Sequence, residues 1–151
     1  RVELRAYPRC DAVTRFVRAN AVAYALHESK RGRCGEYAAA FLAVLEAAGV
    51  EARWVFDTTD HVWCEAWLDG RWVHADPCEA SLGEPEIYQG WGKNGTIVVA
   101  FEARKAEDVT SVYYPDQAAG IRTRRAKDGL RGRSVEKALA AYAERGEGYD
   151  P

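Results

Sequence analysis

HVWCEAWLDGRWVHAD, residues 61–76, is the stretch of this 151-residue chain that decides the fold. At its centre, Asp69-Gly70 is the strongest short signal for a β-hairpin with a two-residue turn. If Leu68 faces Arg71 across that turn, the side chains of both strands alternate between two faces of a sheet. The first face is apolar and predicts a core; it consists of Val62, Cys64, Ala66, Leu68, Val73 and Ala75.

The second face of the predicted hairpin mixes aromatic and ionisable side chains. It consists of His61, Trp63, Glu65, Trp67, Trp72, His74 and Asp76. This mixture is not typical of a solvated surface, and it predicts the floor of a cleft. In this register His61 is the diagonal neighbour of Asp76, with about 5–7 Å between the side-chain roots. The pair suits a carboxylate that orients an imidazole, and Glu65 with His74 is the rival pair.

Cys34 provides the second half of the predicted chemistry. It follows the basic loop Lys30–Arg33 and opens a helical pattern that ends at Gly49. Because a helix N-terminus and nearby cations stabilise a thiolate, we expect the pKa of Cys34 to lie below the usual value of about 8.5. Cys10 and Cys64 lack such surroundings, and the pattern around Cys78, which follows Pro77 in the loop, is ambiguous. With no secretory signal visible, we expect thiols rather than disulfides.

Cys34, His61 and Asp76 therefore form the predicted catalytic set. A cysteine at a helix start, with a histidine and an aspartate on adjacent strands, is a thiol acyl-transfer arrangement. We expect the thiolate to attack an amide carbonyl, the imidazolium to protonate the leaving nitrogen, and the aspartate to fix the imidazole tautomer. His74, in mid-strand, is expected to be a structural hydrogen-bonding residue, and His27 is expected in the last turn of a helix.

The length of the chain predicts one domain, 1–151. Residues 1–19 predict a strand-like stretch with a turn around Tyr7–Arg9. Beyond it we expect helices at about 20–27, 34–48 and after Ser134, where Val135, Leu139 and Tyr142 share one side. Strands are expected at 52–57, 61–68, 71–76 and 96–103. Residues 77–95 predict a long loop, and such loops usually have a function.

Composition and charge exclude several classes of protein. With 21 Lys+Arg against 23 Asp+Glu, the net charge of −2 does not demand a nucleic acid or an anionic membrane as partner. No stretch approaches the roughly 18 apolar residues of a membrane span. The basic stretch 121–133 is expected to be a solvated linker. No signal peptide is visible; because the chain opens with Arg1, it is compatible with a piece of a longer protein.

Three motifs carry a resemblance to a known family: RGRCGEYA (31–38), TDHVWCE (59–65) and RWVHADPCE (71–79). They closely resemble cytosolic peptide:N-glycanases, which belong to the transglutaminase-like superfamily of papain-type thiol enzymes. Shorter matches extend the resemblance over roughly residues 10–125; they lie at 14–16, 90–93, 97–101, 108–110 and 121–125. The resemblance implies an α+β, transglutaminase-like (papain-type cysteine hydrolase) core, in which the catalytic Cys begins a helix packed on an antiparallel sheet.

The resemblance also implies a reaction. It is cleavage of the amide between the first GlcNAc of an N-linked glycan and the asparagine of a misfolded glycoprotein, which leaves aspartate and a glycosylamine. The family's triad falls on Cys34, His61 and Asp76. The implied substrate contacts are Trp63 beside the thiol, and Glu79 and Trp91 on the chitobiose core. Trp72 is a further candidate contact, because it lies on the predicted cleft floor. The family implies a cytoplasmic location, with the nucleus as a further place, and proteasome or ER-degradation factors as partners.

A structural zinc is where this chain departs from the family. The resemblance implies two Cys-x-x-Cys pairs ahead of the catalytic Cys, but only Cys10 is present, and Tyr7 stands three residues before it. A closed zinc site needs about four N or S ligands, and a phenol with a pKa near 10 is a poor one. We therefore expect no metal and no cofactor. Residues 1–19 are interpreted as the remnant of a zinc-ribbon-like region, and 127–151 as a C-terminal basic linker and helix.

Two other functions remain open at this point. One is another thiol enzyme with the same triad, either a transglutaminase or a protease. The other is a non-catalytic module that binds proteins, as in DNA-repair relatives of the superfamily. The loop that holds Glu79 and Trp91 favours a sugar substrate. An intact Cys34, His61 and Asp76 set and the balanced charge count against the binding module.

Overall fold

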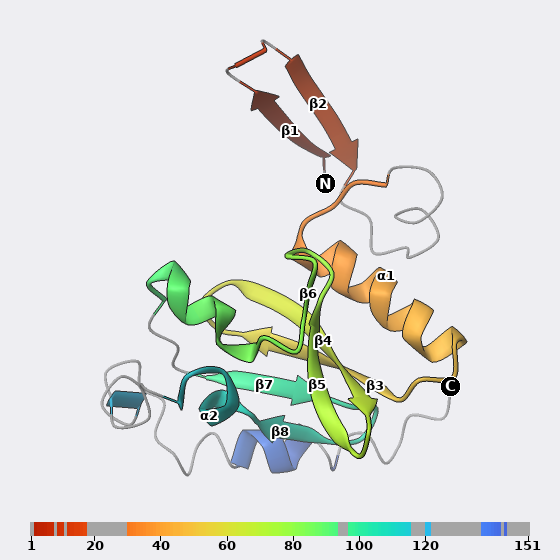
Figure 1. Cartoon of the computed structure of the whole chain (residues 1–151), viewed down its shortest axis with the longest axis vertical. Helices are drawn as coiled ribbons and strands as arrows, with labels where there is room; N and C mark the ends of the chain where they lie inside the picture. The colour runs from red at the N-terminus through yellow and green to blue at the C-terminus, as the bar shows by residue number, and fades with distance from the viewer. Residues whose placement is uncertain are drawn as a thin grey trace.

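A six-stranded antiparallel sheet lies at the centre of the computed structural model, which describes residues 2–7, 9–10, 12–17, 30–93, 97–115, 120–121, 137–142 and 144 (Figure 1). The strand order is β6-β5-β4-β3-β7-β8. The strands are β3 (Ala52–Asp57), β4 (His61–Leu68), β5 (Arg71–Asp76), β6 (Ser81–Leu82), β7 (Val98–Phe101) and β8 (Ala106–Asp108). A separate two-stranded hairpin, β1 (Val2–Tyr7) with β2 (Ala12–Val17), precedes them.

The predicted β4–β5 register is confirmed. Leu68 pairs with Arg71, Trp67 with Trp72 and Glu65 with His74. The turn between the strands has φ of 50° at Asp69 and 78° at Gly70. Positive φ at both central residues defines a type I′ turn, whose twist matches that of the flanking strands. The turn therefore sets which residues of β4 and β5 lie opposite one another.

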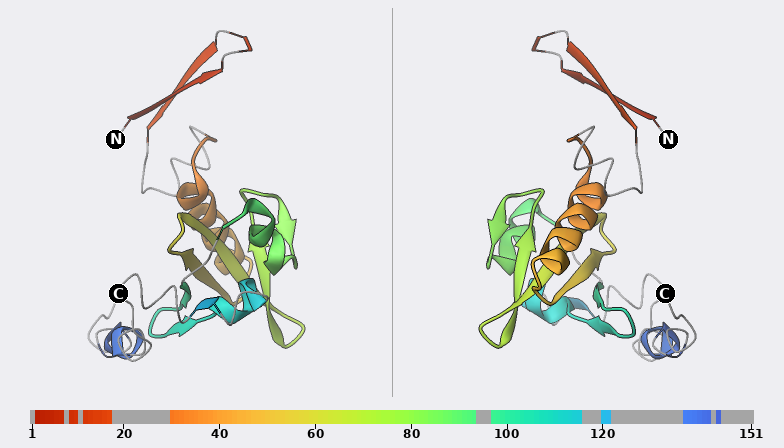
Figure 2. Two further views of the ribbon diagram at one scale, coloured as in Figure 1. Left: turned by 90° about the vertical axis from the view of Figure 1, so that its left-hand side faces the viewer. Right: turned by 90° about the vertical axis from the view of Figure 1, so that its right-hand side faces the viewer.

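Helices cover both faces of the sheet. The helix α1 (Cys34–Ala47) packs on the apolar face, where Ala38, Val62 and Cys64 form a buried cluster. The short helix α2 (Thr110–Tyr113) and the 3-10 helix η2 (Pro85–Trp91) place tyrosines on the opposite face, against Trp63. Figure 2 shows α1 and η2 on opposite sides of the strands. The α+β class predicted from the sequence is confirmed.

Gly49 ends α1, as its position in the helical pattern predicted. The residue has φ of +73°, and its N–H donates to the carbonyl of Glu46 at 2.9 Å. A glycine adopts this left-handed conformation at low cost, so the chain can turn directly from α1 into β3. The connection is short, because only Val50 and Glu51 separate Gly49 from the first residue of β3.

The expected long loop 77–95 contains regular structure instead. The two-residue strand β6 pairs with the end of β5, and η2 starts at Pro85, where the fixed φ of proline suits a helix start. The strand β8 and the helix α2 were also not predicted. Elements of two to seven residues are too short to show a hydrophobic period, so the sequence pattern did not reveal them. The expected strand 96–103 is observed as β7.

The C-terminal part of the chain returns to the sheet. Residues 137–142 are helical, and Leu139 packs on the buried pair Ile97 and Val99. The ring of Tyr142 lies 5.3 Å from that of Phe101. The expected helix 20–27, the basic stretch 122–133, Ser134 and Val135 lie outside the described residues. Among the helices that are described, none is long and apolar enough to cross a membrane.

The positive φ of Gly70 leads to a stability prediction. We expect Gly70→Ala to lower the free energy of unfolding by about 1–2 kcal/mol, because a Cβ is strained in the left-handed region. The measurement is the urea midpoint followed by circular dichroism. Gly90→Ala is the matched control, since this glycine also has open space around it but no positive φ. An equal loss in both variants would contradict the turn type.

Candidate active site

The three residues of the predicted catalytic set meet at one end of the β4–β5 hairpin. His61 is the first residue of β4 and Asp76 is the last of β5. His61 Nε2 lies 2.7 Å from Asp76 Oδ2. Cys34, the first residue of α1, is hydrogen-bonded to His61 from the other side. His61 and Asp76 are buried and Cys34 is half-buried, so the sulfur is the part of the set nearest to solvent.

The carboxylate of Asp76 is saturated with hydrogen bonds. Its Oδ1 accepts from the backbone N–H of Cys78 at 2.8 Å and of Glu79 at 3.2 Å. Its Oδ2 accepts from the Tyr88 hydroxyl at 2.8 Å and faces His61. Burial alone would raise the pKa of Asp76, but the hydrogen bonds from His61 and Tyr88 outweigh it and lower the pKa. Asp76 is therefore a carboxylate acceptor at neutral pH.

His61 and Cys34 shift each other's pKa in the directions that favour a thiolate–imidazolium pair. Burial opposes the charged imidazole, but the hydrogen bonds to Asp76 and Cys34 raise the pKa of His61 to about 9. The hydrogen bond to His61 lowers the pKa of Cys34; burial opposes this shift, and the backbone N–H groups of Val62 and Gly35 assist it. With Nε2 directed at Asp76, the Nδ1 atom is the ring nitrogen available to the thiol.

The expected direction of the Cys34 pKa shift is thus confirmed, but its main cause differs. The sequence indicated the helix N-terminus and the cations of Lys30–Arg33, whereas His61 makes the largest contribution. Arg33 is directed elsewhere: its Nε donates to Glu3 Oε2 at 2.8 Å, which ties the start of α1 to the β1–β2 hairpin. A guanidinium bound to a carboxylate has less effect on a neighbouring thiol.

The β3–β4 turn holds His61 in place. The buried Asp57 accepts hydrogen bonds from the N–H and the hydroxyl of Thr59, both at 2.8 Å, and from the Tyr114 hydroxyl at 2.6 Å. Lys93 Nζ donates to the carbonyl of Thr59 at 2.9 Å. Sequence reasoning missed this support. The run Asp57–Asp60 has the side chains that bond their own backbone in turns, and that signal could have revealed it.

Trp63 lies in the core and not at the site surface, which corrects the expected substrate contact. Its side chain is 0% exposed. The ring stacks on Tyr88 at 4.3 Å and meets Tyr113 edge-on at 4.6 Å. These two tyrosines come from η2 and α2, the elements that the sequence pattern did not reveal. The Trp63 ring therefore packs against the ring of His61, with 5.7 Å between the ring centroids.

Trp91 and Glu79 lie beside the triad. Trp91 is 41% exposed, and its ring meets that of His61 edge-on at 5.1 Å. Glu79 is exposed three residues after Asp76, and its own backbone N–H binds Asp76. Both side chains are thus available to a ligand that approaches His61. Trp72 lies farther along the hairpin, where its ring covers the Arg53 guanidinium at 4.2 Å.

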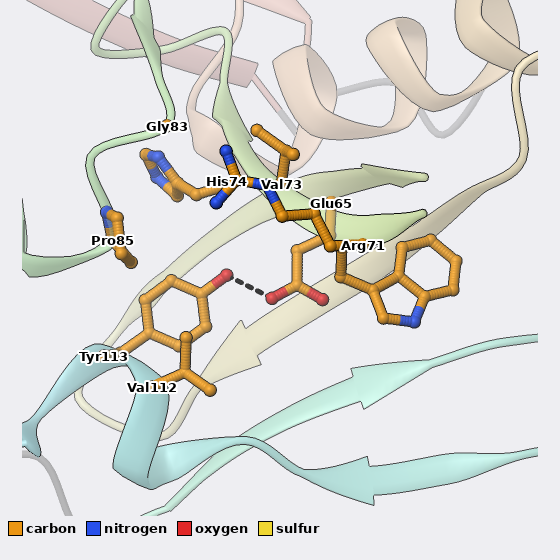
Figure 3. A pocket seen from close by; sticks show the side chains of 9 residues that line it. Glu65, Arg71, Val73, His74, Gly83, Pro85, Val112 and Tyr113 are labelled. Carbon is orange, nitrogen blue, oxygen red and sulfur yellow. Dashed lines mark hydrogen bonds between the residues drawn. The ribbon is translucent and has the colours of Figure 1, made fainter. Parts of the chain in front are cut away.

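The rival pair Glu65 and His74 is opposite in the register but does not form a catalytic pair. Glu65 is bound by Arg53 and by the Tyr113 hydroxyl, whereas His74 Nε2 lies 2.6 Å from the Tyr88 hydroxyl. Burial lowers the pKa of His74 to about 4. These contacts confirm the structural role expected for His74. Both residues line a pocket of about 200 Å³, and Figure 3 shows Tyr113 directed at Glu65 across it.

Cys64 and Cys10 differ from Cys34 in their surroundings. None of the four is in a disulfide, as predicted. Burial raises the pKa of Cys64 to about 12, and its thiol donates to the carbonyl of Ala38 at 3.2 Å. Cys10 is exposed in the β1–β2 turn and lies 3.7 Å from the carbonyl of Tyr7. Within the described ranges, no three His, Cys, Asp or Glu residues are arranged to hold a metal.

Comparison with known proteins identifies the family to which this fold and site belong. The sequence model of the Transglutaminase-like superfamily matches residues 2–77, about half of the chain. The chain belongs to the transglutaminase-like superfamily. Its family and fold class are therefore those that the sequence motifs implied.

Within this superfamily, the chain is similar to proteins named peptide-N(4)-(N-acetyl-beta-glucosaminyl)asparagine amidase. It is 43% identical over 115 residues to that of Eremothecium gossypii, which covers 74% of this chain and 33% of the relative. Identity to the Gallus gallus protein is 44% over 116 residues, or 75% of this chain and 18% of the relative. For Saccharomyces cerevisiae it is 39% over 115 residues, or 74% and 31%. The chain thus spans a third or less of these relatives.

The origin of the Cys34 pKa shift can be tested by alkylation. We expect iodoacetamide near pH 6 to modify Cys34 before the other three cysteines, because the thiolate is the nucleophile. His61→Ala should abolish this preference, since it removes the main cause of the shift. The readout is peptide mass spectrometry after timed labelling.

Arg33→Gln is the matched control for that experiment. It removes a cation next to Cys34 but leaves His61 in place, so labelling of Cys34 should stay close to the wild-type rate. A loss as large as that in His61→Ala would show that the basic loop governs the thiol.

Proposed function

We propose that this chain is an amidase that removes N-linked glycans from glycoproteins by thiol attack on the glycosylated asparagine. The observation that carries the proposal is the assembled set of Cys34, His61 and Asp76, with Trp91 and Glu79 beside it. The names of the relatives support the same substrate class, because they specify the amide between asparagine and N-acetylglucosamine.

The positions of Cys34, His61 and Asp76 support the following chemical steps. The Cys34 thiolate attacks the carbonyl carbon of the asparagine side chain and forms a tetrahedral adduct. The adduct collapses as the C–N bond breaks, and the His61 imidazolium protonates the leaving nitrogen, so a glycosylamine departs and a thioester remains. His61, now neutral, takes a proton from water, and the hydroxide adds to the thioester. Breakage of the C–S bond regenerates Cys34 and leaves aspartate.

Trp91 and Glu79 are proposed to bind the chitobiose core. An exposed indole face stacks on a pyranose ring, and a carboxylate accepts hydrogen bonds from sugar hydroxyls. Trp91 lies against His61, so a sugar stacked on it would place its glycosidic nitrogen near the imidazole. Trp72 is proposed as a more remote contact, because it lines the pocket on the same side of the hairpin. Trp63 is left out of this set because it is buried.

The cellular context is proposed from the same resemblance. Misfolded glycoproteins that reach the cytoplasm are the substrates this chemistry fits, with the nucleus as a further place and with proteasome or ER-degradation factors as partners. We also propose that the chemistry needs no cofactor and that the chain holds no structural zinc, because Cys10 is the only matching ligand. Metal analysis of the purified chain tests this last point, and one equivalent of bound zinc would contradict it.

Mass spectrometry of a denatured N-glycoprotein tests the proposed reaction. We expect incubation with the chain to convert the glycosylated asparagine to aspartate, a gain of about 1 Da over asparagine, because water replaces the amide nitrogen. Cys34→Ala should give no conversion while it retains the fold. Cross-linked glutamine would instead indicate a transglutaminase, and a cleaved backbone would indicate a protease. An unchanged glycopeptide would indicate a binding module.

The ion pair predicts the pH dependence of the rate. We expect kcat/KM to rise with pH as Cys34 loses its proton, and to fall as pH passes about 9, where His61 loses the proton that the leaving nitrogen needs. Asp76→Asn should lower kcat by about 10⁴-fold and shift the alkaline limb to lower pH, because the carboxylate raises the pKa of His61.

Asp69→Asn is the control for the pH experiment. Asp69 is exposed in the hairpin turn, and asparagine suits that turn equally well. Its profile should therefore match that of the wild type. A near-normal rate in Asp76→Asn would contradict the assigned triad.

A further inference from the structure

A continuous chain of hydrogen bonds leads from the triad into the core. His61 Nε2 lies 2.7 Å from Asp76 Oδ2, and the Tyr88 hydroxyl lies 2.8 Å from the same oxygen. His74 Nε2 then lies 2.6 Å from the Tyr88 hydroxyl. All four side chains are buried, so water does not compete for these bonds. Of these four residues, the proposed mechanism uses only His61 and Asp76. Tyr88 and His74 have no role in that mechanism so far.

The protons in this chain have only one consistent arrangement. Asp76 is ionised and can only accept, so the single hydrogen of the Tyr88 hydroxyl is directed at Asp76. The Tyr88 oxygen must then accept from His74, which places a hydrogen on His74 Nε2. Because His74 is neutral, its Nδ1 has no hydrogen. Among the described residues, His74 Nδ1 is buried without a hydrogen-bond partner, so no contact at Nδ1 competes with Tyr88 in setting the tautomer.

Oδ2 of Asp76 is therefore shared between two donors, while Oδ1 is held separately. The backbone N–H groups of Cys78 and Glu79 bind Oδ1 and keep the carboxylate in place whether or not Tyr88 is present. Each hydrogen bond to a carboxylate oxygen takes up part of its negative charge. The Tyr88 hydroxyl thus reduces the charge that remains for His61, and His74 keeps that hydroxyl in the donating direction.

We propose, on the basis of the proposed function, that Tyr88 is a positioning residue of the triad, which shares Oδ2 of Asp76 with His61 and so limits how tightly the carboxylate holds the protonated imidazole. His74 is the positioning residue for Tyr88. An imidazolium held too tightly would be a poor acid toward the leaving nitrogen. The shared oxygen therefore serves the proton-transfer step, and neither Tyr88 nor His74 touches the substrate.

Few other ionisable groups act on this chain. Around His61 they are Cys34 from α1, Asp76 from β5 and Tyr88 from η2. Around His74 they are Asp76, His61 and Glu84, the residue before η2. Glu79 also acts on Tyr88, and the Tyr113 ring lies 6.0 Å from the rings of both His74 and Tyr88. Tyr113 is the nearest comparable phenol: it is equally buried and packs on the same Trp63, but its hydroxyl binds Glu65. Tyr113 therefore offers a matched control.

The test is an NMR titration of the histidine rings in the ¹⁵N-labelled full chain, which has only three histidines. In the wild type, His74 should be the neutral Nε2–H tautomer from pH 5 upward, roughly one unit above its pKa of about 4. In Tyr88→Phe, the titration of His61 should move up by about one pH unit, the size expected when a charge-assisted hydrogen bond to its partner is lost. In Tyr113→Phe, it should match the wild type.

The steady-state kinetics of Tyr88→Phe give a second test. Tyr88→Phe should lower kcat by about tenfold with KM unchanged, because the buried hydroxyl cannot contact substrate. Its alkaline limb should move up together with the His61 titration. The NMR titration needs no substrate, so a chain without amidase activity would refute the proposed function but would still test how Asp76 is shared.

Four results would overturn the proposal. The first is an unchanged His61 titration in Tyr88→Phe, and the second is an equal shift in Tyr113→Phe. The third is a downward shift in Tyr88→Phe, which would mean that Asp76 loses its position and is not shared. The fourth is a wild-type His74 that is charged or carries its proton on Nδ1 at pH 7, and this measurement remains decisive even if Tyr88→Phe does not fold.

Discussion

The register of the β4–β5 hairpin is the constraint on which the rest of the structure depends. Positive φ at both Asp69 and Gly70 fixes a two-residue turn, and the turn fixes the pairing of the strands. A slip of one residue would turn every side chain to the opposite face. His61 and Asp76 would then separate, and the apolar side chains that contact α1 would face the tyrosines. The same local geometry thus determines both the core and the site.

Burial of charge is the second main feature of the molecule. Three buried carboxylates lie on neighbouring central strands, and each accepts a hydrogen bond from a tyrosine that follows them in the sequence. The pairs are Asp57 with Tyr114, Glu65 with Tyr113, and Asp76 with Tyr88. A buried carboxylate without such partners would cost several kcal/mol. The short elements η2 and α2 are therefore essential to the sheet, because they carry Tyr88 and Tyr113, and Tyr114 directly follows α2.

The three carboxylates differ in what else binds them. This difference distinguishes the two that stabilise the fold from the one that takes part in the proposed reaction. Asp57 also accepts from Thr59 and shapes the turn before His61, whereas Glu65 is neutralised by Arg53. Asp76 alone faces an imidazole, and that imidazole reaches a half-buried thiol. Asp76 is therefore the one of the three carboxylates placed to act in the proposed chemistry, because its charge is offset by a group that can give up its proton.

Local sequence determined the hairpin, its register, the helix from Cys34 and the meeting of the triad, because turn chemistry and side-chain period act over a few residues. Only the tertiary structure decided what covers the site. The burial of Trp63, the main cause of the Cys34 pKa shift and the separate partners of Glu65 and His74 all depend on contacts between distant segments. Tyr88 and Tyr113 come from elements too short to show a period, and their hydroxyls find partners only once η2 and α2 pack on the sheet.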